Sequence, residues 1–94
     1  MKFLALARRD KLFALWAAAR LGLTGAARDA LIQGLLAVQG FPKHDAALLA
    51  FVAKPFAAAG ADPSEAPQAL DRLGEEAGEQ VRLGTATPID LTSR

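Results

Sequence analysis

The chain contains no cysteine and no tyrosine, and among its 94 residues it has one histidine and two serines. The absence of cysteine excludes disulfides, zinc fingers and thiol catalysis, and it permits a reducing compartment, so we expect a cytoplasmic location. A nucleophile needs a base close by, and Ser64 and Ser93 have no histidine near them in the sequence. The one histidine, His44, has no second imidazole with which to share a metal. The sequence therefore predicts a protein that is not an enzyme and that uses no metal and no cofactor.

Long apolar runs and β-branched residues are also scarce. No apolar run approaches the roughly 20 residues that a membrane-spanning helix requires. Valine, isoleucine and threonine are few, whereas alanine, the best helix former, makes up roughly a quarter of the chain. Apolar residues account for 52% and charged residues for 22%, which is typical of a folded domain. These proportions predict an all-α fold.

Four segments carry apolar residues at helical spacing, and glycine or proline separates them. The expected helices cover about residues 2–21, 25–39, 44–56 and 65–83. Short connections between such helices favour antiparallel neighbours, so we predict a compact antiparallel four-helix bundle. Residues 1–83 are expected to form this single helical domain, and residues 84–94 a flexible C-terminal tail.

The ends of these helices have recognisable signals. Gly22 is placed to end the first helix, because glycine adopts positive φ at little cost. The hydroxyls of Thr24 and Ser64 are predicted to cap the starts of the second and fourth helices. Pro55 lies inside the third segment, where it removes one hydrogen bond, so a kink or break after Ala53 is expected.

Charge is distributed unevenly along the chain. Residues 1–20 contain five cations and one anion, whereas residues 62–90 contain seven anions and two cations. The two regions are expected to attract each other or partners of opposite charge. A net charge of +1 is too small for a general nucleic-acid binder, so no nucleic-acid partner is predicted. Glu75 and Glu79, at i and i+4, are interpreted as part of a solvated helix face.

The first helix brings Arg8, Arg9 and Lys11 close to Trp16. The cations could bind phosphate groups, or the helix could lie on a membrane surface with its aromatic side buried. In the third interpretation Trp16 anchors the core and the cations face solvent. The chain has few other large residues for a core, which favours this last interpretation. Leu12 and Leu15 share a helical face with Trp16, and these three residues are predicted to be structural anchors.

Residues 7–25, with the sequence ARRDKLFALWAAARLGLTG, followed by FAAAG at residues 56–60, resemble the bacterial ATPase inhibitor subunit zeta family. The resemblance implies an all-α fold of four helices and a role in restraining ATP hydrolysis by the F-type ATP synthase. In that family inhibition depends on an acidic and aromatic segment that precedes the ARRDKL block. No position of this chain corresponds to that segment, which leaves the chain's own inhibitory activity in doubt.

Three hypotheses of function follow. The first is a zeta-type regulatory module that docks on the F-type ATP synthase, with Arg8, Arg9 and Lys11 directing it towards an acidic surface. The alternative is a membrane-surface or self-associating scaffold, unrelated to the ATP synthase, that uses the alanine- and leucine-rich faces of the second and third helices. The third is nucleotide binding by the basic region of the first helix.

Overall fold

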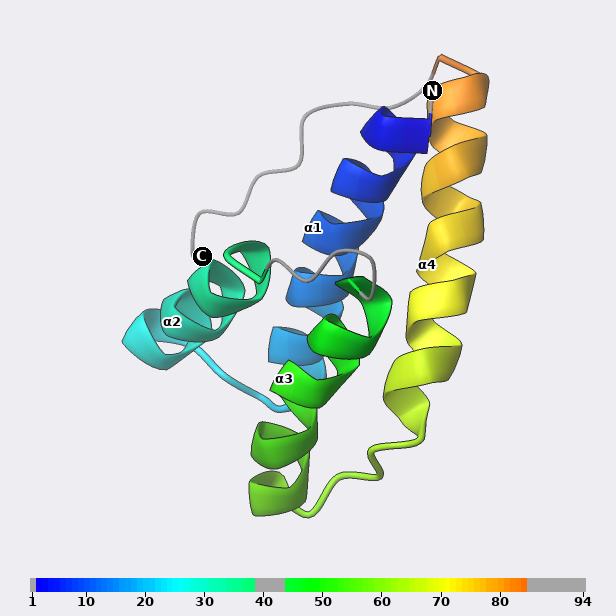
Figure 1. Ribbon diagram of the computed structural model, residues 1–94. Coiled ribbons are helices and arrows are strands. Elements are labelled where there is room, and N and C mark those ends of the chain that lie inside the picture. The colour runs from blue at the N-terminus through cyan, green and yellow to red at the C-terminus, as the bar shows by residue number, and fades with distance from the viewer. Residues whose placement is uncertain (1, 39–43, 85–94) are drawn as a thin grey trace.

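The computed structural model describes residues 2–38 and 44–84. These residues form four helices and no strand, which confirms the all-α fold. The helices are α1 (Lys2–Arg20), α2 (Gly25–Leu36), α3 (His44–Ala59) and α4 (Glu65–Arg82). Figure 1 shows α1 and α4 side by side and antiparallel along most of their length, with α2 on the other side of α1 and with α3 lying across α1 and contacting α4. The arrangement is a helical bundle in which α1 is the central element.

Each helix contributes one apolar stripe to a common core, as the helical period predicts. The buried apolar side chains are Phe13, Ala14, Ala17, Ala18, Leu31, Ile32, Leu35, Leu48, Val52, Phe56, Ala66, Ala69, Leu70, Leu73 and Ala77. Leu12, Leu15 and Trp16 are partly buried and pack against this core. The Trp16 ring stacks on Phe13 at a centroid distance of 5.7 Å and on Phe56 at 5.6 Å, within the range of favourable aromatic pairs. The aromatic stack therefore joins α1 to α3.

The connections after α1 and α3 each contain a glycine in the left-handed region. Gly22 has a φ of 68°, and the Leu23 N–H donates to the Ala18 carbonyl at 3.0 Å, which satisfies a carbonyl of the last turn of α1. Gly60 has a φ of 74° directly after α3. The predicted role of Gly22 is thereby confirmed. A side chain with a Cβ at either position would strain the backbone.

The two predicted hydroxyl caps are wrong. Thr24 precedes α2 in an extended conformation but its hydroxyl makes no capping hydrogen bond, and neither does the hydroxyl of Ser64 at the start of α4. At the start of α4 the N–H groups of Glu65 and Ala66 donate instead to the carbonyls of Asp62 and Pro63, both at 3.1 Å. Separately, the Asp62 carboxylate accepts a hydrogen bond from the Ser64 N–H at 2.9 Å. That bond is the main reason why the pKa of Asp62 is lowered. Backbone carbonyls, and not a hydroxyl, therefore satisfy the first N–H groups of α4.

Two boundaries also differ from the prediction. Helix α2 ends at Leu36, before the expected position 39. The hydrogen bonding changes there to the three-residue spacing of a tighter turn, in which the Val38 N–H donates to the Leu35 carbonyl at 3.2 Å. Helix α3 continues through Pro55 to Ala59, so the expected break after Ala53 does not occur. Proline removes only one hydrogen bond, and the buried stripe of α3 extends on both sides of it. The predicted tail, apart from Gly84, lies outside the described residues.

Candidate functional site

The three cations expected to form one surface on α1 point in different directions. Successive residues of a helix are rotated by about 100°, so Arg9 and Lys11 lie on nearly opposite sides of α1. Arg9 is buried, with 7% of its surface exposed, whereas Lys11 is exposed. Arg8 is half-buried, and its Nε donates to Oε1 of Gln80 on α4. The structure therefore does not bring the three side chains together in one cationic patch.

Arg9 forms the centre of a charged cluster between α1 and α3. Its Nη2 lies 2.9 Å from Oδ1 of Asp45, and its Nη1 lies 3.3 Å from Oδ2 of the same carboxylate. Two parallel hydrogen bonds of this kind fix the orientation of both groups. Nη2 of Arg9 also donates to Oδ1 of Asp10 at 2.8 Å. One buried guanidinium therefore holds a carboxylate from its own helix and another from the first turn of α3.

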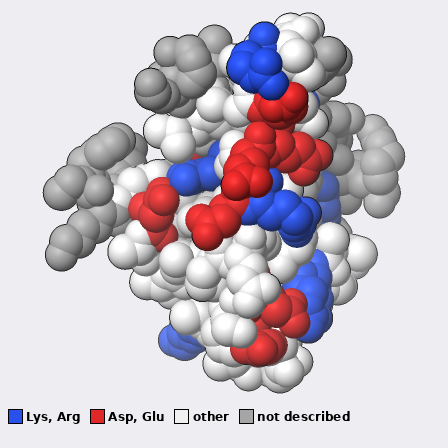
Figure 2. All heavy atoms as spheres, turned by 90° about the vertical axis from the view of Figure 1, so that its right-hand side faces the viewer, with Lys and Arg blue, Asp and Glu red and all other residues white. Residues whose placement is uncertain are grey.

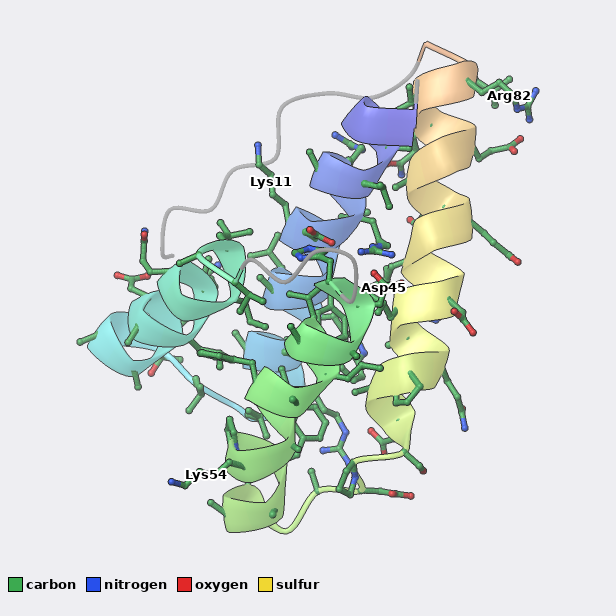
Figure 3. All side chains as sticks on the ribbon, viewed as in Figure 1. Lys11, Asp45, Lys54 and Arg82 are labelled. Carbon is green, nitrogen blue, oxygen red and sulfur yellow. The ribbon has the colours of Figure 1, made fainter. Side chains whose placement is uncertain are left out.

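His44 completes this group, which we call the Arg9 cluster: Arg9, Asp10, His44 and Asp45. Nε2 of His44 lies 2.8 Å from Oδ2 of Asp10, so Asp10 bridges the arginine and the histidine. His44 and Asp45 are the first two residues of α3. The cluster therefore fastens the start of α3 to α1, and in Figure 3 Asp45 lies on the side of α3 that faces α1 and α4.

The electrostatics of the Arg9 cluster combine two opposing effects. Burial disfavours the charged guanidinium, while hydrogen bonds to Asp45 and Asp10 favour it, and the net result is a raised pKa of Arg9. Arg9 therefore keeps its charge although it is buried. On the α4 side its methylene groups pass over Gly74, where a Cβ would lie 3.3 Å from Cδ of Arg9. The small residue leaves room for the arginine to reach Asp45.

A second ion pair joins the end of α1 to the start of α4. Nε and Nη2 of Arg20 donate to the two oxygens of Glu65 at 2.6 and 3.1 Å. The hydrogen bonds from Arg20 are the main reason why the pKa of Glu65 is lowered, and the same pair raises the pKa of Arg20. Glu65 also stands in the first turn of α4, where the helix dipole favours a negative charge. Both groups are exposed enough for salt to weaken the pair.

The outer face of α4 is predominantly acidic. Figure 2 views the molecule from this side and shows a row of carboxylates flanked by cations. Its exposed acidic residues are Asp71, Glu75, Glu76 and Glu79. Glu79 pairs with Arg82 at 2.6 Å, one turn further along the helix. Among residues 2–38 and 44–84, no three potential metal ligands come together, and these carboxylates belong to a solvated helix face.

The sequence interpretation missed three members of the Arg9 cluster. Asp45 lies 36 positions from Arg9 in the sequence, and His44 lies 34 positions from Asp10, so no local spacing links them. One signal was present: Asp10 is the only anion among the first 20 residues and follows two arginines directly. For His44 the sequence excluded only a shared metal site; the structure places this residue at the start of α3, where its ring binds Asp10.

The comparison with known families gives one match. The family model described as ATPase inhibitor subunit zeta matches residues 1–80. The chain belongs to the ATPase inhibitor subunit zeta family. This confirms the resemblance carried by residues 7–25 and 56–60. The zeta family is regulatory rather than catalytic, and its name implies an interaction with the ATP synthase. No curated protein and no solved structure matches the chain.

None of α1 to α4 combines the length and the apolar character that crossing a bilayer requires. The two longest, α1 and α4, each carry several charged side chains.

Proposed function

We propose that this chain is a non-enzymatic regulatory module that docks on the F-type ATP synthase in the cytoplasm. The observation that carries the proposal is the family match over residues 1–80. The fold supports it, because the described residues build a helical body whose buried polar groups hold helices together. A protein with this role acts through its surface, by presenting a fixed set of side chains to its partner.

The cations of α1 have different roles in this proposal. Lys11 is exposed and offers a positive charge to an acidic surface of the partner, which increases the rate of encounter. Arg8 lies at the edge of the α1–α4 pair, next to Gln80. Arg9 contributes indirectly, because it holds the start of α3 and so fixes the surface that α3 presents. Leu12, Leu15 and Trp16 stabilise the same helix against the core.

Intrinsic inhibition is a separate question from docking. We propose that the described helical body is sufficient to bind the ATP synthase. The experiment is a pull-down with purified ATP synthase, combined with an assay of ATP hydrolysis that shows whether binding also inhibits. Retention of the chain supports the proposal, and no retention at saturating concentration contradicts it.

The alternative of a membrane-surface or self-associating scaffold has one observation in its favour. Leu36 and Phe51, on α2 and α3, remain 37% and 38% exposed. The family match favours a partner on the ATP synthase over a scaffold unrelated to it. Flotation with anionic vesicles and light scattering distinguish the two: a monomer that ignores vesicles but is retained by the ATP synthase excludes the scaffold. Nucleotide binding by α1 is tested by titration with ATP, followed through amide chemical shifts.

A further inference from the structure

Helix α2 packs against the body of the molecule mainly through the second half of its length. Its buried side chains are Leu31, Ile32 and Leu35. In the first half every residue from 25 to 30 is exposed except Arg28, which is half-buried. Figure 1 shows the start of α2 extending away from α1, α3 and α4. The apolar contact that holds α2 is therefore short, whereas the buried residues of α4 extend over most of that helix.

Helices α3 and α4 have a polar attachment to α1 in addition to their apolar one. The Arg9 cluster holds the start of α3, and the pair of Arg20 with Glu65 holds the start of α4. On α2, Arg28 and Asp29 lie 3.5 Å apart, but this pair joins neighbouring residues of one helix and does not connect α2 to α1. We therefore attribute much of the attachment of α2 to the apolar side chains of its second half.

Two glycines in the left-handed region stand at either end of the connection between α1 and α2. Gly22 has a φ of 68°, and Gly25, the first residue of α2, has a φ of 59°. A Cβ at either position would meet no atom within 4 Å, so these glycines serve the backbone conformation and not close packing. Hinges are formed by a few residues at the ends of elements that can absorb a large change of φ and ψ, and glycine does so with the least steric hindrance. Residues 22–25 are therefore suited to let α2 turn relative to α1.

The contact between α2 and α3 is formed by a ring that is itself partly exposed. The Phe51 ring of α3 lies against Gly34 of α2, so closely that a Cβ on this glycine would come within 2.5 Å of Cζ. Phe51 is 38% exposed and does not belong to the buried stripe of α3. Separation of the ring from Gly34 therefore does not by itself displace the core residues of α3.

We propose that α2 opens from the folded body as a separate unit, by turning about residues 22–25, while α1, α3 and α4 stay packed together. Proteins open in cooperative units, and the units with the fewest buried contacts open most easily. In the closed form the Phe51 ring acts as a clasp on Gly34. The open form exposes the three apolar side chains that α2 buries, so the chain carries an apolar surface that is accessible only when α2 opens. This inference concerns the chain alone and does not depend on the proposed function.

The first test is amide hydrogen exchange of the unchanged chain, measured by NMR at several low concentrations of urea. The amides of Ile32 and Leu35 on α2 are expected to exchange at least about tenfold faster than those of Val52 and Phe56 on α3. The two α2 amides should also share one urea dependence, smaller than that of α3, because opening of α2 exposes less surface than unfolding. Equal exchange in the two helices overturns the proposal. Exchange of α2 that is independent of urea shows fraying of its ends and overturns it too.

The second test measures how fast a buried thiol becomes accessible, and it has a matched control. The chain has no cysteine, so Leu35→Cys on α2 and Leu48→Cys on α3 each introduce a single thiol. Both leucines are 1% exposed. The Leu35→Cys variant is expected to react with iodoacetamide at least about tenfold faster than the Leu48→Cys variant. Equal rates contradict the proposal. Circular dichroism establishes that both variants are folded, and the exchange of the unchanged chain decides the question where one is not.

A third variant tests the clasp. Phe51→Ala removes the ring and is expected to accelerate the reaction of the Leu35→Cys thiol about fivefold, while it leaves the Leu48→Cys thiol unchanged. Lys54→Ala alters an exposed side chain of the same helix and should affect neither thiol. Acceleration of both thiols by Phe51→Ala to the same degree would show that the ring stabilises the whole fold and would overturn its role as a clasp on α2.

A fourth variant tests the hinge. Gly25→Ala places a side chain at positive φ, which strains the closed form, and the strain is released when α2 turns away. The reaction of the Leu35→Cys thiol is expected to become about fivefold faster, and that of the Leu48→Cys thiol to stay the same. Gly60→Ala introduces a similar strain after α3, at a φ of 74°, and should not accelerate the Leu35→Cys thiol selectively. If Gly25→Ala accelerates both thiols equally, its strain is released only by unfolding of the whole chain, and the proposal is overturned.

Discussion

Helices α3 and α4 differ most on the sides that the core does not cover. Both bury one apolar stripe: α3 with Leu48, Val52 and Phe56, and α4 mainly with alanine and leucine. The outer side of α4 is charged, as is usual for an amphipathic helix. The outer side of α3 carries mostly alanine, with Phe51 and Lys54. The inner stripes are sufficient to build the bundle. The difference between the outer sides therefore reflects the different surroundings of the two helices outside the core.

The two helices also differ in how they are fastened to α1. The start of α4 is held by Glu65, which pairs with Arg20 in an exposed position. The start of α3 is held by the Arg9 cluster, in which the guanidinium is buried. An exposed pair is screened by water and salt, whereas a buried charge becomes costly once its partner is removed. The position of α3 is therefore expected to depend more strongly on its ion pairs.

The largest effect is expected inside α3. Phe56→Ala should lower the free energy of unfolding by about 3–4 kcal/mol, because it removes a fully buried ring that stacks on Trp16. Phe51→Ala, on the outer side of the same helix, should cost at most about 1 kcal/mol. Urea denaturation followed by Trp16 fluorescence measures both variants. Similar losses of stability in Phe56→Ala and Phe51→Ala would show that the inner and outer sides of α3 contribute equally, which would contradict this description.

The second largest effect is expected at the Arg9 cluster. Arg9→Ala should cost about 2 kcal/mol, because Asp10 loses its guanidinium partner in a half-buried position. Arg72→Ala, at an exposed position of α4, should change stability by no more than about 0.5 kcal/mol. Thermal denaturation of both variants under the same conditions tests this. Equal stability of Arg9→Ala and the unchanged chain would contradict the role given to the cluster.

Two glycine substitutions should act in opposite directions. Gly78→Ala on α4 meets no atom within 4 Å and should stabilise the chain by about 0.5–1 kcal/mol through helix propensity. Gly34→Ala on α2 pushes against the Phe51 ring and should cost about 1 kcal/mol. Denaturant midpoints measured side by side reveal the sign of each change. Stabilisation by both substitutions would mean that Phe51 moves away freely from α2.

The smallest effect is the loss of stability in acid that arises from the start of α4. The pKa values of Asp62 and Glu65 are lowered, by the Ser64 N–H and by Arg20 respectively, so the folded chain binds protons less readily than the unfolded chain at these groups. Their contribution to stability is therefore present at neutral pH and is lost as the pH falls through their folded pKa values. Melting temperatures of the unchanged chain should fall between about pH 5 and pH 2, and less steeply for Asp62→Asn with Glu65→Gln. If the melting temperature of the double variant falls with pH as steeply as that of the unchanged chain, this linkage is ruled out.

The features that the sequence predicted well are local. Leu48, Val52 and Phe56 repeat at four-residue spacing and are all buried, and Gly22 ends α1 as glycine does. The hydroxyl cap of Ser64 failed because the N–H groups of Glu65 and Ala66 donate to backbone carbonyls and Pro67 has no N–H to offer. Backbone carbonyls of the preceding turn compete with a side-chain cap, and residue spacing alone does not decide between them.

The features that could not be predicted depend on contacts between distant positions. The burial of Arg9 follows from Asp45 on another helix and from the space left by Gly74, neither of which shows in the sequence around Arg9. The unbroken course of α3 through Pro55 depends on packing of its stripe against α1 and α4. The local sequence determines which segments are helical and which side of each helix is buried. The ion-pair partners of a charged side chain depend instead on how the helices assemble.

Hydrogen exchange of the complete chain, measured with and without purified ATP synthase, tests the central claim most directly. The account predicts slower exchange in part of the described helices when the ATP synthase is present, because docking covers part of their surface. Equal exchange in both samples at saturating ATP synthase would contradict it.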